Sequence, residues 1–505
     1  MTLVPADRDR YIVPRWRRSS NAASYQELAA TRQVDELVEG VDANFLAREA
    51  EFERAPGLWT AADLISAAAA RGIETELVRA AASVVRSHHA PTAALSLLIA
   101  GPDVPTPDLT GSPARLGQLG DEARERVRIA RAELSERPRN AFRWLDLALA
   151  HVTLGNVGSG RRAIETSLAL APQNRLVLRS AARFFVHVDD PEQALFWLER
   201  SQRLTGDPWL LAAHISVSQV AEIPMRNVRD ARLLLGDASI ASISASELSA
   251  AVATQELGAG KDKSARALMT KALLDPTENS VAQAIWARDK GLSGVDVRAN
   301  AVPRAFEADT LAAMQTSDWD SAQVAVEGWL ADEPFSLRAS VHGSYIAITG
   351  HEDYQRAYEL ADFGLRSNPG DPMLLNNAAF ALANLGRIEE ANDLLTIAEP
   401  EEPTLQTLIQ ATRGLVAFRD GEVLAGRERY RDAIGSFIKR GETDLAALCQ
   451  VMWTREEVRA STDLGKSLAS QLSLSDPRFR HRDTSLWISR VKTALGAGPT
   501  RSSDA

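Results

Sequence analysis

The most evident candidates for binding chemistry are two arginines, Arg179 and Arg183, which stand four residues apart in a segment that we expect to be helical. This spacing places both guanidinium groups on one face of a helix, where together they could bind a carboxylate or a phosphate. The alternative is that both side chains are solvated and pair with nearby acidic residues. The sequence leaves these two interpretations open.

Motifs for catalysis are absent from the sequence. There is no G-x-S-x-G, and His351-Glu352 is followed by Gln355 where an H-E-x-x-H zinc site needs its second histidine. The stretch GAGKDKS at residues 258–264 superficially resembles a phosphate-binding loop, but its spacing is wrong and Asp262 replaces the hydroxyl residue. We therefore expect a protein that is not an enzyme and has no cofactor and no metal site.

The other reactive side chains have simpler structural explanations. His88 and His89 come where we expect a helix to end, and a cation there interacts favourably with the helix dipole. Cys449 lies in the apolar segment LAALCQVMW, which is typical of a core helix. Because it is the only cysteine, neither an intrachain disulfide nor a cysteine-based zinc site can form.

Composition narrows the class of protein. The 505 residues are 45% hydrophobic and 25% charged, which is typical of a globular chain rather than a disordered one. The net charge of -10 argues against direct binding of nucleic acid, although a local basic patch remains compatible with it. No stretch approaches the roughly 18 to 20 apolar residues of a membrane span, and the first residues lack the apolar core of a signal peptide. We expect a cytoplasmic protein, with a composition that suggests a bacterial source.

A ladder of small residues indicates how the helices are arranged. Its rungs follow one another at steps of 34, 37, 34, 57, 35, 34, 35 and 34: Gly160, Ala194, Ala231, Ala265, Ala322, Ala357, Ala391, Gly426 and Ala460. A period of about 34 residues is typical of an array of helix pairs. Two antiparallel helices pack closely only where small side chains lie at their crossing point.

The clearest unit is DPMLLNNAAFALANLGRIEEANDLLTIAEPEEP, in which Gly386 makes the turn, Ala391 lies on the second helix and Pro403 closes the repeat. Over roughly residues 140–475 this pattern resembles the tetratricopeptide repeat (TPR) family, with about nine degenerate repeats. The resemblance implies an all-α fold: a right-handed α-solenoid of antiparallel helix pairs, preceded here by an N-terminal helical region.

We expect six segments along the chain. They are a basic flexible tail (1–20), an N-terminal helical region ending in a Pro/Gly loop (21–112), a first TPR-like sub-array (113–290), an irregular insertion (291–303), a second sub-array with a capping helix (304–495) and a flexible tail (496–505). The insertion falls in the 57-residue step and serves either as a hinge or as a binding loop. Whether residues 25–112 form a separate domain or cap the solenoid is left open.

In the TPR family, the first helix of each repeat lines a concave groove that binds a peptide. The family pattern places these residues of the chain on that groove: Phe142, Leu145, Leu149, Arg179, Arg183, Asn376, Asn377 and Phe380. Asn377 takes the position at which some members bond a peptide backbone. The subclass that clamps a C-terminal carboxylate also needs Lys and Arg in adjoining first helices, where this chain has His342, Ile346, Leu408 and Thr412. A receptor for chaperone tails is therefore not expected.

The tail at residues 1–20 is a second candidate contact. Its five arginines outnumber its two aspartates, and hydrophobic residues are interleaved among them. Since Trp and Arg are frequent interface anchors, Tyr11, Arg15, Trp16 and Arg17 are candidate partner-binding residues; the alternative is a solvated terminus. We expect that deleting residues 1–20 weakens partner binding and leaves the melting temperature unchanged.

The function that we expect is that of a non-enzymatic adaptor or scaffold, which binds a partner protein or peptide in its groove and assembles or regulates a complex. No membrane contact is expected. The alternative is a ligand- or peptide-sensing regulator with a divergent N-terminal helix-turn-helix-like region. Ala68, Gly72, Ile73 and Val78 match that motif, whereas Glu74 and Glu76 would repel DNA phosphates. The partner and the oligomeric state are not predicted.

Overall fold

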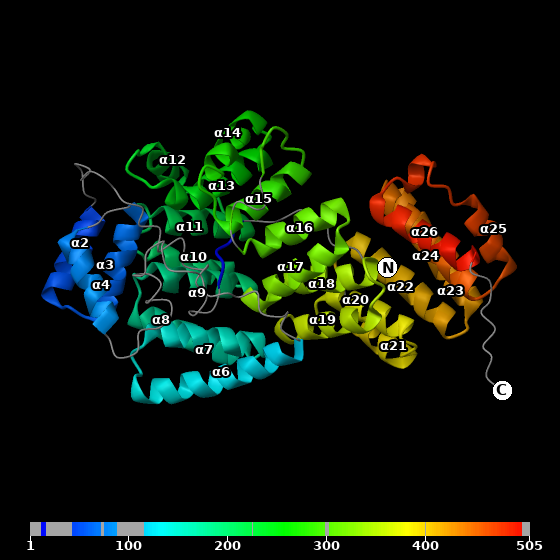
Figure 1. Cartoon of the computed structure of the whole chain (residues 1–505), viewed down its shortest axis with the longest axis horizontal. Coiled ribbons are helices and arrows are strands. Elements are labelled where there is room, and N and C mark those ends of the chain that lie inside the picture. The colour runs from blue at the N-terminus through cyan, green and yellow to red at the C-terminus, as the bar shows by residue number, and fades with distance from the viewer. Residues whose placement is uncertain are drawn as a thin grey trace. The chain divides into compact units, whose positions relative to one another are not determined.

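The structure is a computed structural model, and it describes residues 12–16, 43–71, 75–87, 116–224, 226–297, 302, 304–398 and 400–496. These residues form helices and their connections, with no strand among them (Figure 1). Contacts divide the chain into two units. The N-terminal unit comprises Asp7–Gln315 and Val324–Phe335, and the C-terminal unit includes Thr316–Gln323 and Ser336–Ala505.

The helices of the N-terminal unit are α2 (Ala43–Arg54), α3 (Leu58–Arg71), α4 (Glu76–Ser87), α6 (Leu116–Glu136), α7 (Ala141–Thr153), α8 (Val157–Leu170), α9 (Arg175–His187), α10 (Pro191–Glu199), α11 (Pro208–Val220), α12 (Val228–Gly236), α13 (Ser242–Gly258), α14 (Asp262–Ala272), α15 (Glu278–Asp289) and α16 (Phe306–Thr316). Helix α17 (Trp319–Asp332) is divided between the two units.

The C-terminal unit continues with α18 (Leu337–Thr349), α19 (Tyr354–Ser367), α20 (Pro372–Asn384), α21 (Ile388–Ile397), α22 (Pro403–Arg419), α23 (Val423–Lys439), α24 (Thr443–Arg459), α25 (Asp463–Gln471), a short 3-10 turn (Pro477–Phe479) and α26 (Arg482–Gly496). No described helix is both long and apolar enough to cross a membrane.

The helices begin and end where the local sequence favours it. The side chains of Asn174, Asp207 and Asp371 accept hydrogen bonds from backbone N–H groups in the first turns of α9, α11 and α20, which satisfies donors that have no partner within the helix. Gly155 and Gly386 turn the chain into the following helix with φ of 76° and 81°, a conformation that glycine adopts without steric cost.

The ladder of small residues lies at the crossings within helix pairs. Each of the first eight rungs, from Gly160 to Gly426, is buried on the second helix of a pair. At Gly160 an added Cβ would lie 2.9 Å from Val152, and at Gly426 it would lie 2.5 Å from Phe418. The predicted array of TPR-like helix pairs is thereby confirmed as the architecture of both units.

The prediction for the ninth rung was wrong. Ala460 is exposed at the end of α24, and the buried small residue of the last pair is Gly465 on α25. A Cβ on Gly465 would lie 2.7 Å from the carbonyl of Glu457. The displacement follows from helix length, because α22, α23 and α24 have 17 residues each whereas α20 has 13. A fixed step of 34 residues therefore stops short of the crossing.

The long step between Ala265 and Ala322 contains an additional helix. Helix α15 occupies the place of a first helix, but the described residues after it, 290–297, form no second helix. Leu292 and Val295 are buried, so this connection packs onto the N-terminal unit. Helix α16 then pairs with α17, where Gly328 lies against Phe306. The division between units falls within α17 rather than at the expected insertion, 291–303.

The described N-terminal helices cap the first array. The ring of Trp59 on α3 lies 5.1 Å from that of Phe142 on α7. The side-chain amide of Asn174 donates a hydrogen bond to Asp63 at 2.8 Å. The apolar residues of α2–α4 belong to the same core cluster as those of the repeat helices. Within the described residues, the region is thus part of the N-terminal unit and not a separate domain.

We predict that Gly465→Ala destabilises the protein. The new Cβ would meet backbone atoms of α24, which cannot rotate away, and such overpacking costs about 1–3 kcal/mol. The matched control is Gly435→Ala on α23, where no atom lies within 4 Å of the new Cβ and the change should be neutral or stabilising by about 0.5–1 kcal/mol. Urea unfolding followed by circular dichroism checks both variants. Equal unfolding midpoints would contradict the crossing at Gly465.

Candidate partner-binding site

The segment of residues 12–16 lies inside the N-terminal unit. Figure 1 shows it as a short dark-blue trace among the helices of the first array. Ile12 is fully buried and Trp16 is 1% exposed, and both belong to the core cluster of this unit. A stretch of the chain that forms neither helix nor strand is therefore buried among the helices of the array.

Trp16 is held between two phenylalanines. Its ring lies 6.0 Å from that of Phe184 on α9, in an edge-on arrangement, and 5.4 Å from that of Phe335, which follows α17. The guanidinium of Arg183 lies over the Phe335 ring, 4.9 Å from its centre. These contacts remove the whole indole from water, and an aromatic side chain of this size is a large apolar anchor.

Arg15 is surrounded by carboxylates from three elements. It pairs with Glu307 on α16 and, at 2.7 Å, with Glu333 after α17. Burial alone would lower the pKa of Arg15, but the charges of Glu307, Glu333 and Glu278 outweigh it and raise the pKa above its ordinary value. All three glutamates are themselves less than 10% exposed. We call Glu278, Glu307 and Glu333 the acidic cage.

The backbone of the segment is bound as well. The side-chain amide of Asn279 on α15 donates to the carbonyl of Val13 at 3.0 Å. The backbone N–H of Trp16 donates to Glu333 at 3.4 Å, and the indole N–H of Trp329 donates to the same carboxylate at 3.2 Å. The segment thus contacts side chains from several different repeats rather than one helix.

These contacts differ from the free tail that we expected for residues 1–20. Arg15 and Trp16 are not available to a separate partner in this structure, because they pack against residues about 170 to 320 positions later in the chain. Tyr11 and Arg17 lie outside the described residues. The acidic cage, Asn279 and Phe335 were not predicted as site residues. The excess of arginines in residues 1–20 was the one feature of the sequence that pointed to an acidic binding surface elsewhere in the chain.

The two arginines of α9 have different surroundings. Arg179 is buried and pairs with Glu247 at 3.0 Å, and its guanidinium lies 5.1 Å from the centre of the Trp209 ring. Arg183 lies beside the segment, stacked on Phe335 and 3.9 Å from Glu333. Both therefore pair with acidic residues of the chain, and only Arg183 contributes to the surroundings of Trp16.

The other predicted groove residues are buried between helices. Phe142, Leu145 and Leu149 belong to the core of the N-terminal unit, each less than 5% exposed. In the C-terminal unit Asn376, Asn377 and Phe380 are fully buried. Asn377 donates to Ser344 at 3.0 Å, and Asn376 accepts from Thr412 at 2.7 Å. In this structure these side chains join neighbouring repeats, and none of them is exposed to a partner.

The predicted capping helix is α26, and it closes the C-terminal unit by contacts with both α24 and α18. Trp487 lies between the guanidinium groups of Arg455 and Arg490, 5.1 and 4.6 Å from its ring centre. Arg490 also donates to the carbonyls of Thr349 and Gly350, at 2.7 Å each. The cap is therefore packed structure that ties the last repeat to the first repeat of this unit.

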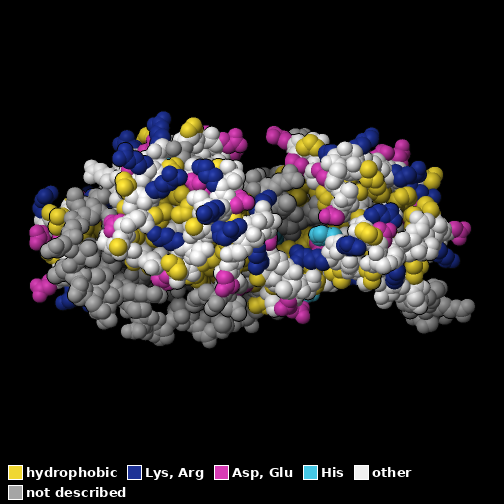
Figure 2. All heavy atoms as spheres, turned by 90° about the horizontal axis from the view of Figure 1, so that it is seen from above, with side chains coloured by type: hydrophobic (Ala, Val, Ile, Leu, Met, Phe, Trp, Pro, Cys, Tyr) yellow, Lys and Arg dark blue, Asp and Glu magenta, His cyan; other side chains and the backbone are white. Residues whose placement is uncertain are grey.

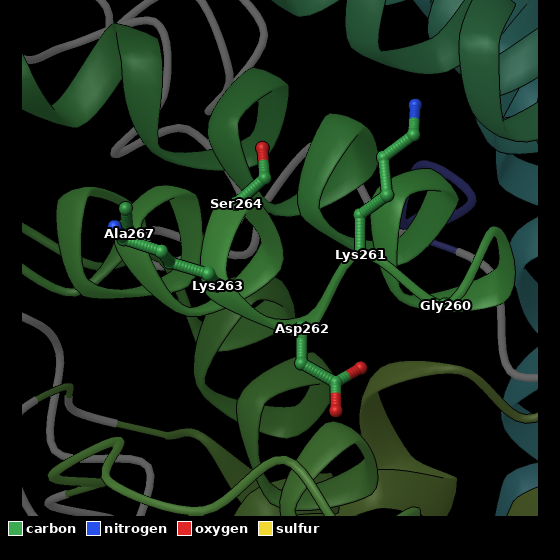
Figure 3. Close-up of a pocket in the computed structure, with 6 residues that line it drawn as sticks. All are labelled: Gly260, Lys261, Asp262, Lys263, Ser264 and Ala267. Atoms are coloured by element: carbon green, nitrogen blue, oxygen red, sulfur yellow. The ribbon is translucent and has the colours of Figure 1, made fainter.

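The glycine-rich stretch 258–264 forms a shallow hollow at the start of α14. Gly260, Lys261, Asp262, Lys263, Ser264 and Ala267 line it. Figure 3 shows Lys261 and Asp262 pointing in opposite directions, so that their polar groups do not converge on one point. Lys261 pairs instead with Glu256 at 3.4 Å. The arrangement lacks the convergent groups that hold a phosphate.

Charged side chains of both signs lie on the face of the protein that Figure 2 shows. In Figure 2, Lys and Arg side chains lie among Asp and Glu side chains on the face in view. Arg232 and Lys261, both exposed, pair with the carboxylate of Glu256.

No group of three or more potential metal ligands is found among the described residues. Burial raises the pKa of the Cys449 thiol to about 12, which keeps it protonated at neutral pH.

We predict that Trp16→Ala lowers the stability of the full chain by about 3–5 kcal/mol, the usual cost of removing a buried aromatic side chain. The control is Leu233→Ala on α12, where the side chain is 63% exposed and the change should stay within about 0.5 kcal/mol. Thermal unfolding followed by circular dichroism measures both. From the sequence we expected deletion of residues 1–20 to leave the melting temperature unchanged, and the structure reverses that expectation. An unchanged melting temperature for Trp16→Ala would show that the segment is not packed.

We predict that Arg15→Ala destabilises the chain by about 3–5 kcal/mol at neutral pH, because the acidic cage loses the buried cation that pairs with both Glu307 and Glu333. The raised pKa of Arg15 means that its contribution is fully present below the pKa of an unfolded arginine, hence throughout the physiological range. In the variant, three carboxylates stay buried without the guanidinium that pairs with them. Urea unfolding at pH 7.5 measures the loss. An unfolding midpoint equal to that of the wild-type chain would contradict the assignment.

No protein-family model matches the chain, and no curated protein matches it in sequence. Among solved structures, it is similar to yeast Tom70, at 12% identity and a TM-score of 0.29 over 77% of this chain and 97% of that one. It is also similar to the APC/C hetero-tetramer Cut9-Hcn1, at 12% identity and a TM-score of 0.29 over 82% of this chain and 93% of that one. The helix pairs and their buried small residues show an α-solenoid fold.

Proposed function

We propose that this protein is a non-enzymatic, TPR-like adaptor that binds a partner protein or peptide on the inner surface of its helix array and thereby assembles or regulates a complex. The observation that carries the proposal is the bound segment of residues 12–16. Its contacts with Phe184, Asn279, Glu307 and Glu333 come from four different elements of the N-terminal unit. Binding of one extended peptide by several repeats is the usual work of such a surface.

The buried charges of the described residues support a structural use rather than catalysis. Arg175 pairs with Asp207 at 2.6 Å, Arg419 with Glu456 at 2.8 Å, and Arg427 with Glu457 at 2.6 Å. Each pair joins two helices of the array. Charged groups committed to neighbouring helices fix the geometry of the repeats, whereas a catalytic group must face a substrate.

The regulator with a helix-turn-helix-like region receives less support. Ala68 and Val78 are buried, as that motif requires, but so are the corresponding residues of any close helix pair. Glu76 is exposed at the start of α4, where its carboxylate would face a DNA phosphate. The adaptor is therefore the function that we propose.

The test is to isolate the full-length, tagged chain from its native host and to reconstitute any co-purified protein with the purified chain. We expect a partner that binds with defined stoichiometry by calorimetry and that survives nuclease treatment. Absence of any reconstituted partner would contradict the adaptor function, and a mobility shift of duplex DNA at low salt would favour the regulator instead.

We predict that substitutions on the outer face leave this binding unchanged. Leu233→Asp on α12 and Leu424→Asp on α23 alter side chains that are 63% and 76% exposed, so both variants should fold. If the partner lies on an inner surface, its Kd should change by less than about twofold, measured by the same calorimetry. A loss of binding in either variant would place the contact on the outer face of that unit.

A further inference from the structure

We infer that the inner surface of the N-terminal unit recognises an extended peptide in which Arg is followed by Trp, and that residues 12–16 are its resident intramolecular ligand, which a partner peptide of the same chemistry displaces. This inference rests on the proposed function and names the chemistry of the partner. It also makes the segment a competitor that controls access to the surface.

The acidic cage is the first step of the inference. Its three carboxylates come from the start of α15, from α16 and from the residue next to the end of α17, and they converge on one guanidinium. Burying three like charges is costly unless a cation enters with them. Arg15, which belongs to no helix of the array, brings such a cation, in addition to Arg183 of α9, which lies 3.9 Å from Glu333. A guanidinium suits the place because its fork of N–H groups reaches Glu307 and Glu333 at once.

The aromatic anchor is the second step. Trp16 contacts both Phe184 and Phe335, and the guanidinium of Arg183 lies over the Phe335 ring. Arg183 lies both over Phe335 and 3.9 Å from Glu333, so the cage and the aromatic site adjoin. Arg and Trp next to each other can therefore fill both sites at once. These two residue types dominate the binding energy of many interfaces.

The array also bonds the main chain of the segment. Asn279 donates to the carbonyl of Val13, and Glu333 accepts from the N–H of Trp16. Both array partners are side chains that bond main-chain groups, which every peptide presents. Selectivity for the peptide's side chains therefore comes from the acidic cage and the aromatic site. The direction and register of the peptide come from the bonds that Asn279 and Glu333 make with its main chain.

The manner of attachment makes displacement feasible. Residues 12–16 form no helix and contact side chains of the array, and residues 17–42 connect them to α2. A tethered ligand competes at an effective concentration of about millimolar, so a free peptide binds weakly until the tethered copy is weakened. The segment therefore sets the affinity that a partner peptide must exceed in order to displace it.

The experiment uses a fluorescein-labelled synthetic peptide of residues 10–18, RYIVPRWRR, and fluorescence anisotropy. We predict that the full chain with Trp16→Ala binds this peptide at least about 10-fold more tightly than the wild-type chain does, because its own segment competes less well. The same peptide with Trp16→Ala, or with Arg15→Gln, should lose at least about 10-fold in affinity. Adding Glu333→Gln to the Trp16→Ala chain should weaken binding similarly. Equal affinities of the wild-type and Trp16→Ala chains would overturn the inference.

A second form of the experiment does not depend on the stability of Trp16→Ala. A protease site inserted between residues 20 and 40 of the otherwise wild-type chain is cleaved after purification, so that the native segment becomes a separate peptide. We expect the labelled peptide to exchange with it, and the helix content to stay unchanged. A cleaved segment that stays bound and never exchanges over a day would show a fixed structural element and overturn the inference.

The two proposals fail in different ways. If peptide exchange fails but a reconstituted partner still binds the chain, the adaptor function stands and the displacement inference falls. If the peptide exchanges but no host protein can be reconstituted with the chain, the recognition chemistry stands and the adaptor function falls.

Discussion

The close crossing of paired helices at small residues is the constraint on which both units depend. At Gly426, for example, the second helix approaches so closely that a methyl group would overlap the ring of Phe418. Because the two helices of a pair pack so closely, the large apolar and polar side chains pack in the space between neighbouring pairs. Buried ion pairs such as Arg175 with Asp207 lie in that space and join one repeat to the next.

Each unit also holds a piece of the chain that lies outside its regular pairs. In the N-terminal unit this is the segment of residues 12–16, and in the C-terminal unit it is α26. Both use a buried tryptophan beside arginines, Trp16 near Arg183 and Trp487 between Arg455 and Arg490. The two differ in form, however. Helix α26 satisfies its own backbone, whereas the segment relies on Asn279 and Glu333 of the array, which is how a bound peptide is held.

The sequence was sufficient for the architecture because helix pairs repeat locally. Small residues, capping side chains and turn glycines such as Gly386 act within about 34 residues, so their spacing is visible in one chain. The last crossing, at Gly465, was misplaced because lengthened helices change the step. The site was not predictable in the same way. Arg15 meets Glu307 and Glu333 only through the fold, and no local pattern links residues about 300 positions apart.

The central claim is that residue 16 lies between Phe184 and Phe335 of the same chain. The most direct measurement replaces Trp16 with the photoreactive residue benzoylphenylalanine in the full chain and identifies its cross-links by mass spectrometry. The account predicts an intramolecular cross-link to the α9 peptide that contains Phe184 or to the peptide that contains Phe335. Cross-links confined to other parts of the chain, or none above the solvent background, would contradict it.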